Sequence, residues 1–106
     1  MAARFEIWLV ALDPTQGAEI DKTRPAAVIS PDDANLHLRT VIVAPLTSRR
    51  RAWPTRVPVV LARTRGDVAL DQMRAVDRAR LVRKVGTLKA EEQNGVLDAL
   101  ARMFAR

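Results

Sequence analysis

The chain of 106 residues is predicted to be a small α+β protein, mainly β, in which one C-terminal helix packs against an antiparallel β-barrel. Short apolar runs follow one another, separated by clusters of Pro, Gly, Asp and Thr, which is typical of strands joined by turns. From Ala90 onward the apolar residues recur every three or four positions, which is typical of a helix. We therefore expect residues 1–106 to form one domain of this architecture.

The first half of the chain contains three predicted strands. They are Phe5–Val10, Pro25–Ser30 and Thr40–Leu46. A polar loop that starts with the turn-forming segment 13–17 separates the first two. Segment 31–33 favours a short helical turn before the third, with His37 as a polar residue on its surface. Trp8 lies inside an apolar run, so we expect it in the core.

The second half begins with a predicted strand at Val57–Leu61. Pro58 has no backbone N–H to donate to a neighbour, so this strand is expected at the edge of the sheet. Gly66 and Asp67 are typical of a turn. Residues 68–70 and 73–76 are predicted to be strand, although arginine and apolar residues alternate imperfectly from there to residue 81.

The predicted helix begins near Ala90. Its apolar residues Val96, Leu97, Leu100 and Phe104 recur at three- and four-residue spacing. Glu91 and Glu92 in the first turn interact favourably with the helix dipole. Lys89 is a poor N-cap, and Gly95 weakens the helix by up to about 1 kcal/mol relative to alanine. Packing must therefore stabilise this helix.

Positive charge is concentrated in the middle of the chain. The net charge is +6, but residues 37–89 alone contain thirteen Lys and Arg against three Asp and Glu, a balance of +10. A one-sided basic field is expected of a protein that binds a polyanion, because each neutralised phosphate releases condensed counterions. The alternative is a solvated basic surface that serves solubility.

The composition excludes several kinds of site. Without cysteine and with one histidine, the chain cannot form disulfides, thiolate zinc sites or histidine-rich metal centres, which leaves carboxylate-held magnesium open. The longest uncharged apolar run, Ile7–Leu12, is far shorter than the roughly 20 residues that span a bilayer. Glu6 beside this run argues against a signal peptide, so we expect a cytoplasmic protein without membrane contact.

Side chains at two strand ends are candidates for binding one phosphate. Arg24 precedes a proline at the entrance of the second predicted strand, and Thr47 and Ser48 follow the third. A guanidinium beside a fixed backbone can present its fork to a phosphate, and a hydroxyl can bond the same group. The alternatives are a surface salt bridge from Arg24 to an acidic residue of loop 13–21, and hydroxyls that bond nearby backbone.

Two further groups carry polar chemistry. Asp71, Gln72 and Arg74 place a carboxylate, an amide and a guanidinium together, enough to recognise a base edge or bind a phosphate. A plain Asp–Arg ion pair is the alternative. Trp53 lies in a loop with three arginines, where an exposed indole would offer an unstacked base a platform. The alternative is an indole packed beneath its own loop.

With these residues in place, the chain resembles the MazF/PemK/Kid family of toxin endoribonucleases over nearly its whole length. Each matching segment is a weak signal alone, but their order and spacing together are specific. The segments are Phe5–Val10, Leu12–Glu19, Lys22–Pro31, Val43–Ser48, Pro54–Thr55 and Leu70–Arg78.

The resemblance implies an SH3-like barrel of the PemK/CcdB-like fold that forms a homodimer. It implies cleavage of single-stranded RNA, such as mRNA, at short sequences, without metal or cofactor, which inhibits translation and growth. In this family the ribose 2′-OH attacks its own 3′ phosphate, leaving a 2′,3′-cyclic phosphate and a 5′-OH end. A cognate MazE-like antitoxin silences the enzyme, and the basic block of residues 37–89 would attract its acidic C-terminal tail.

The resemblance also assigns catalytic residues. Arg24 and Thr47 match the catalytic pair, and because a guanidinium keeps its positive charge in proteins, we interpret Arg24 as a charge clamp on the phosphorane. Thr47 would hydrogen-bond the same phosphate. One branch of the family places an arginine two residues before an aspartate and uses both. Here Ala69 occupies that position, so Asp71 lacks its partner as a base.

The remaining site predictions concern RNA contacts. The predicted RNA-binding residues are Glu19, Ser48, Arg49, Arg51, Trp53, Gln72 and Arg74. Loop 13–23 would gate the site. Sequence specificity is expected in the arginine-rich loop, because loops tolerate change while the barrel beneath does not.

Two other functions stay open at this stage. A gyrase poison of the CcdB type shares the barrel but acts through protein contact and does not need Arg24 or Thr47. A non-catalytic RNA-binding barrel, or a decayed toxin, would keep the basic surface without cleaving RNA.

Overall fold

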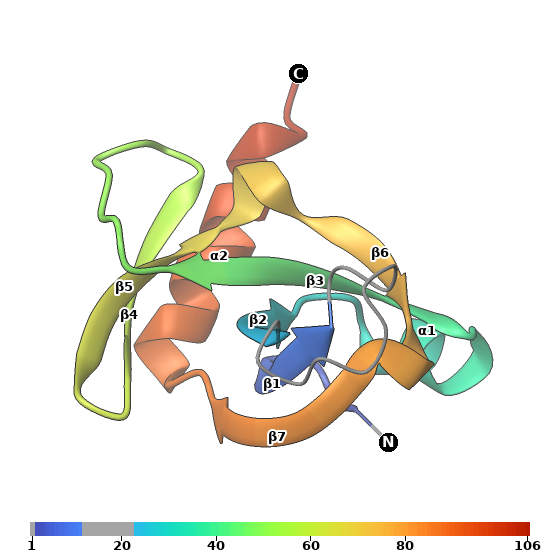
Figure 1. The fold of residues 1–106 in the computed structure, drawn as a ribbon. Helices are drawn as coiled ribbons and strands as arrows, with labels where there is room; N and C mark the ends of the chain where they lie inside the picture. Colours follow the sequence, from blue (N-terminus) through green and yellow to red (C-terminus); the bar gives the residue numbers. More distant parts are fainter. Residues whose placement is uncertain (1, 12–22) are drawn as a thin grey trace.

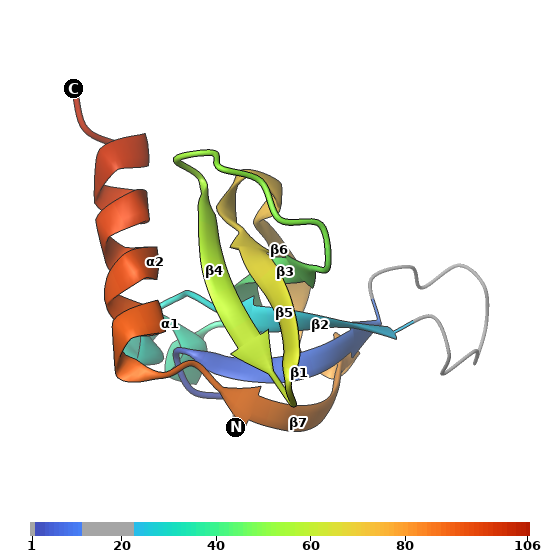
Figure 2. The same ribbon diagram turned by 90° about the vertical axis from the view of Figure 1, so that its left-hand side faces the viewer.

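The strands form a curled, antiparallel sheet of seven strands, and a long helix packs along one side of it (Figures 1 and 2). The computed structural model describes residues 2–11 and 23–106. Its elements are β1 (Glu6–Ala11), β2 (Thr23–Val28), α1 (Asp32–His37), β3 (Thr40–Thr47), β4 (Arg56–Leu61), β5 (Thr64–Ala69), the 3-10 helix η3 (Leu70–Gln72), β6 (Arg74–Asp77), the 3-10 helix η4 (Arg78–Arg80), β7 (Leu81–Thr87) and α2 (Ala90–Met103). The predicted mainly β architecture with a C-terminal helix is confirmed.

Strand β3 is the centre of the sheet. The strand order is β4-β5-β3-β2-β1-β7, and β6 also pairs with β3. The first half of β3 pairs with β6, from Thr40 opposite Asp77 to Val43 opposite Arg74. Its end pairs with β5, where Thr47 lies opposite Asp67. One eight-residue strand thus joins the two parts of the sheet (Figure 1).

The two ends of this strand order approach each other. A side-chain carbon added to Gly86 of β7 would lie 2.9 Å from Leu61 Cδ1 at the end of β4. Such curling follows from the right-handed twist of strands, which accumulates across a sheet. The result is a half-barrel with a buried interior.

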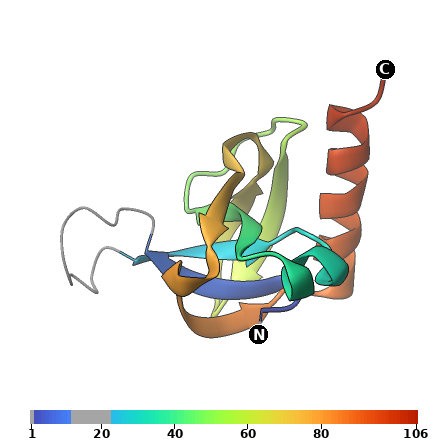
Figure 3. The ribbon, with the colours of Figure 1, turned by 90° about the vertical axis from the view of Figure 1, so that its right-hand side faces the viewer.

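Both faces of the central strands are buried, in two separate apolar clusters. On β2, Ala27 belongs to one cluster, whereas its neighbours Ala26 and Val28 belong to the other. The first cluster lies under α2 and includes Val96 and Ala99 of that helix. Figures 2 and 3 show α2 standing along this side of the molecule. This packing stabilises a helix whose sequence has a poor N-cap and an internal glycine.

Glu92 connects α2 to strand β4. Its side chain is 8% exposed, and its carboxylate accepts the backbone N–H of Lys89 at 2.8 Å and that of Val60 at 3.0 Å. The first bond caps the helix start, which Lys89 cannot do with its own side chain. The second satisfies an outward-facing donor of β4.

Strand β4 lies at the edge of the sheet, as Pro58 predicted. All of its residues lie opposite β5 partners, from Arg56 opposite Ala69 to Leu61 opposite Thr64. Among its even-numbered residues, Arg56 donates its N–H to Trp53 O at 3.0 Å, Pro58 has no N–H, and Val60 donates to Glu92.

Two sequence predictions are wrong and one element was not predicted. Gly66 and Asp67 lie inside β5, and the chain turns at Ala62 and Arg63, which have φ values of 49° and 69°. Trp8 is half-buried at the margin of the second cluster, and its indole donates to Glu6 Oε1 at 3.1 Å. Strand β7 was not predicted.

Glu92→Gln is expected to lower the free energy of unfolding by about 1–3 kcal/mol, because an amide oxygen replaces two carboxylate acceptors and leaves one partly buried N–H without its bond to a charged group. Glu91→Gln, at the exposed neighbouring position, should change it by less than about 0.5 kcal/mol. Urea unfolding of both variants measures the difference. Equal effects would contradict the role given to Glu92.

Candidate active site

The register of β2 and β3 brings Arg24 and Thr47 to the same level. Ala26 lies opposite Pro45, and Val28 lies opposite Val43. When this antiparallel register is extended by two residues towards the start of β2, Arg24 lies opposite Thr47. Arg24 is exposed at the start of β2, and Thr47 is half-buried at the end of β3. The two strand ends identified in the sequence therefore meet at one place.

A cavity of about 740 Å³ opens at this place. Its polar lining comes from the start of β2, the end of β3, the start of β5 and the end of η3: Arg24, Thr47, Ser48, Thr64, Arg65 and Gln72. Among the described lining residues the charged side chains are Arg24 and Arg65, and both are cations. This volume lies in the range of sites that enclose a small ligand. A cavity with two guanidinium groups and several hydroxyls suits an anion such as a phosphodiester.

The position of Thr47 is fixed by its neighbours. A Cβ at Gly66 would fall on the carbonyl oxygen of Thr47, so only glycine permits β5 to approach this closely. The Thr47 Oγ1 accepts the backbone N–H of Arg49 at 3.2 Å. Because a hydroxyl that accepts a bond can still donate its own proton, Thr47 can donate to a phosphate oxygen.

Gln72 and Arg74 lie in different surroundings. Gln72 ends η3 and lines the cavity, so the structure brings it together with Arg24 and Thr47. Arg74 is exposed on β6, opposite Val43 of β3, and is not among the lining residues. The amide is therefore the member of this sequence group that reaches the cavity.

Asp71 forms an ion pair with Arg56 of β4. Arg56 Nε lies 2.8 Å from Oδ1 and Nη2 lies 3.3 Å from Oδ2, while Thr55 Oγ1 donates to Oδ1 at 2.9 Å. The Arg56 guanidinium, helped by the Thr55 hydroxyl, holds the pKa of Asp71 below its ordinary value of 3.8. A lowered pKa makes a carboxylate a weaker base, and Asp71 is not among the residues that line the cavity.

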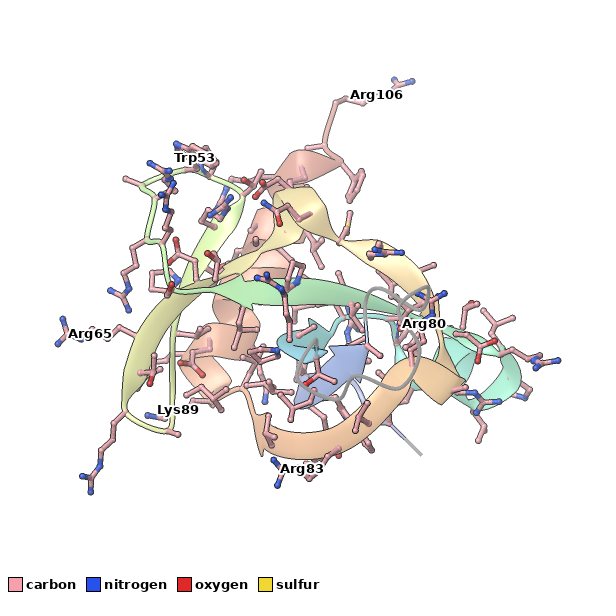
Figure 4. The ribbon with its side chains drawn as sticks, in the orientation of Figure 1. Trp53, Arg65, Arg80, Arg83, Lys89 and Arg106 are labelled. Carbon is pink, nitrogen blue, oxygen red and sulfur yellow. The ribbon has the colours of Figure 1, made fainter. Side chains whose placement is uncertain are left out.

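The arginine loop, residues 48–55, carries Trp53 on its outer end (Figure 4). The Trp53 side chain is 49% exposed, so the packed alternative is wrong. The guanidinium carbons of Arg51 and Arg56 lie 5.3 and 4.6 Å from its ring centroid, within the range of cation–π contacts. Arg49 and Arg51 are exposed, and the backbone N–H of Arg51 donates to buried Asp67 at 2.8 Å.

Some predicted site residues lie outside the described ranges, and the structure adds two residues that were not predicted. Glu19 and the rest of loop 13–22 lie outside the described residues, as do the acidic partners considered for Arg24. Arg65 of the cavity was not predicted, although the basic run Arg63-Thr-Arg65 was a visible signal. Arg56 gave no local signal, because its partner lies 15 residues away.

A family model described as PemK-like, MazF-like toxins of type II toxin-antitoxin systems matches residues 3–104. The chain belongs to this family. Endoribonuclease PemK of Escherichia coli is 36% identical over 107 residues, which cover 95% of this chain and 80% of the relative. Endoribonuclease MazF9 of Mycobacterium tuberculosis is 35% identical over 111 residues, which cover 94% and 93%. The predicted family is thus confirmed.

Solved structures of the family share the fold. The Mycobacterium tuberculosis toxin MazF-mt6 superimposes with a TM-score of 0.76 at 26% identity, covering 93% of this chain and 95% of that one. MazF of Deinococcus radiodurans gives a TM-score of 0.78 at 25% identity, covering 99% and 97%. The half-barrel described above is therefore the fold of MazF toxins.

Two further observations concern the described residues of this MazF-like toxin. Over residues 2–11 and 23–106, no helix combines the length and apolar character needed to cross a membrane. Over the same residues, no three His, Asp or Glu side chains are grouped to hold a metal ion.

Asp71→Asn is expected to lower the free energy of unfolding at pH 7 by about 1 kcal/mol, a value kept small by the partial exposure of Asp71. Because the pKa of Asp71 is lowered in the folded state, its stabilising effect is present above the ordinary pKa of 3.8 and is lost as the pH falls through the folded value.

Denaturant unfolding of both proteins between pH 7 and about pH 3 measures this effect. The difference in free energy of unfolding between wild type and Asp71→Asn should become smaller at acidic pH. Asp98→Asn, at an exposed position of α2, is the control, and its free energy of unfolding should depend on pH in the same way as that of wild type. A gap that stays constant over this range would show that the ion pair does not stabilise the fold.

Proposed function

We propose that this toxin is a metal-independent endoribonuclease that cuts single-stranded RNA, with Arg24 and Thr47 at the scissile phosphate. The observation that carries the proposal is that these two side chains line one cavity together with Arg65 and Gln72. The names of its relatives, endoribonucleases PemK and MazF9, support the same activity. We also propose that residues 1–106 act as one domain, which the match over residues 3–104 supports.

In this reaction the protein mainly has to align the ribose 2′-OH with the phosphate and to stabilise the negative charge of the phosphorane. The ribose 2′-oxygen attacks the adjacent phosphorus and loses its proton, a pentacoordinate phosphorane forms, and the bond to the 5′-oxygen breaks as that oxygen gains a proton. The products are a 2′,3′-cyclic phosphate and a 5′-OH end. No water has to be activated, so no metal-bound hydroxide is needed. Positioning and stabilisation of developing charge supply the rate enhancement.

Each cavity side chain has a role in this scheme. Arg24 is a permanent cation that clamps the phosphorane oxygens, and Arg65 adds positive charge to the same cavity. The Thr47 hydroxyl donates to a phosphate oxygen and thereby fixes its orientation. Ser48 and Gln72 offer further bonds to the ribose or to a base edge.

The arginine loop binds the rest of the RNA chain in this proposal. Arg49 and Arg51 contact phosphates, and exposed Trp53 offers its ring to an unstacked base. Arg74 extends the basic surface, and Glu19 would act from the neighbouring loop. The sequence preference of cleavage resides in the arginine loop.

Two partners complete the proposal. The first is a cognate antitoxin, which the family description and the basic block of residues 37–89 support; a mycobacterial endoribonuclease of the same fold has been solved with its cognate antitoxin. The second is another copy of this chain. Leu97 of α2, 40% exposed, and Phe104 directly after this helix, 70% exposed, are apolar side chains of the kind that a second subunit covers.

Arg24→Ala is expected to reduce cleavage of a long unstructured RNA by roughly 10²- to 10³-fold, because one charged contact to the phosphorane is lost. The assay contains EDTA, and the cut positions and end groups are mapped. Wild-type protein should leave cyclic phosphates at short recurring motifs. Arg83→Ala removes the same charge from exposed β7 and should cut like wild type. Equal activity of Arg24→Ala and wild type would overturn the proposal, whereas a wild-type protein that poisons gyrase and spares RNA would favour the CcdB-type function.

Substitution of both Arg49 and Arg51 by alanine is expected to weaken RNA binding and to reduce the slope of log Kd against log salt by about 0.7 for each lost phosphate contact. The ligand is an RNA containing the mapped cut site with a single 2′-deoxy nucleotide, which lacks the attacking hydroxyl and is bound without being cut. Fluorescence anisotropy at several salt concentrations gives the slope. An unchanged slope would show that the arginine loop does not contact phosphates.

A further inference from the structure

Arg56 lies directly across the sheet from Ala69. The two residues are opposite each other in the antiparallel pairing of β4 and β5. Directly opposite residues of an antiparallel pair project from the same face of the sheet. A side chain from position 56 therefore enters the same space as a side chain from position 69, two residues before Asp71.

The guanidinium of Arg56 is held firmly in this space. Its side chain is 6% exposed, and Nε and Nη2 bond the two carboxylate oxygens of Asp71 at 2.8 and 3.3 Å. Two parallel bonds fix both the distance and the orientation of a carboxylate, which a lysine cannot do. Thr55 Oγ1 adds a third bond to the same carboxylate at 2.9 Å.

This ion pair joins three segments around the cavity. Asp71 belongs to η3, whose first residue, Leu70, donates its N–H to Thr55 O at 3.0 Å. Gln72, directly after Asp71, lines the cavity. The other contact of the Arg56 guanidinium is the ring of Trp53, 4.6 Å away. One side chain thus connects β4, η3 and the arginine loop.

We infer that Arg56 is a positioning residue for RNA cleavage, which supplies to Asp71 the guanidinium that Ala69 does not provide and so holds Gln72 in the cavity wall. The inference rests on the proposed function. In this role Asp71 is an anchor rather than a proton acceptor. Arg56 itself does not touch the scissile phosphate. Its loss therefore affects how RNA is seated more than the chemical step.

Arg56→Ala is expected to raise KM for a short RNA with the mapped cut site by roughly 10- to 100-fold, with a smaller change in kcat, because a displaced Gln72 loses its contact with the RNA. Arg24→Ala should do the reverse and change kcat more than KM. Arg83→Ala removes the same charge from an exposed position of β7 and should alter neither constant. An Arg56→Ala protein with wild-type KM and cut motif would overturn the inference.

The effect of Arg56→Ala on KM should be rescued when an arginine is introduced at the opposite residue of the strand pair, position 69. The double variant Arg56→Ala/Ala69→Arg places an arginine at position 69, where one branch of the resembled family has one, in the space that Arg56 vacates. KM should return towards the wild-type value. A double variant that folds like wild type by circular dichroism and thermal unfolding but keeps the raised KM would overturn the inference. If Arg56→Ala does not fold, Asp71→Asn breaks the same pair from the other side. The raised KM is then expected of Asp71→Asn, and an unchanged KM would overturn the inference.

A measurement without RNA separates this inference from the proposed function. Wild-type protein that cuts no RNA would refute the proposed function alone. The side-chain amide signal of Gln72 in a ¹⁵N NMR spectrum then decides whether Arg56 positions it. We expect this signal to shift in Arg56→Ala and to stay in place in Arg83→Ala. An unmoved signal in a folded Arg56→Ala protein would overturn the inference.

Discussion

Strand β3 pairs with three other strands, and the candidate site takes its geometry from these pairings. Its pairing with β2 sets Arg24 level with Thr47, and its pairing with β5 brings Gly66 against the Thr47 carbonyl. Because side chains of β3 are buried on both faces of the sheet, a slip in its register would move apolar residues out of both clusters. The apolar core therefore specifies the position of the polar site, although the two share few residues.

The parts of the fold that the sequence predicted are those with strong local patterns. Strands β1, β2, β3 and β4 coincide with apolar runs, α1 begins at the helix-favouring segment 31–33, and α2 begins at a clear change of period. Pro58 predicted the edge strand because a missing N–H has the same consequence in any sheet. Arg24 and Thr47 were identified because both stand at strand ends, where exposed polar side chains are supported by a rigid framework.

The parts that were missed depend on contacts between distant residues. Strand β7 is mostly exposed, contains Arg83 and Lys84, and pairs with β1 through two register shifts, so it lacks the regular alternation of a strand. Gly66 resembles a turn residue, but it is required for the close approach of β5 to Thr47. The partner of Asp71 could not be inferred locally, because it comes from the neighbouring strand β4 and not from position 69.

The outward edge of β4 has a consequence for how copies of this protein behave in concentrated solution. An edge strand with free N–H groups can recruit a strand from another molecule, and this is a common start of aggregation. In β4 each outward position is already occupied or has no donor: Arg56 bonds its own loop, Pro58 has no N–H, and Val60 bonds Glu92. The same contacts that anchor α2 and the arginine loop thus close this edge to further strands, which protects an exposed β-sheet from uncontrolled self-association.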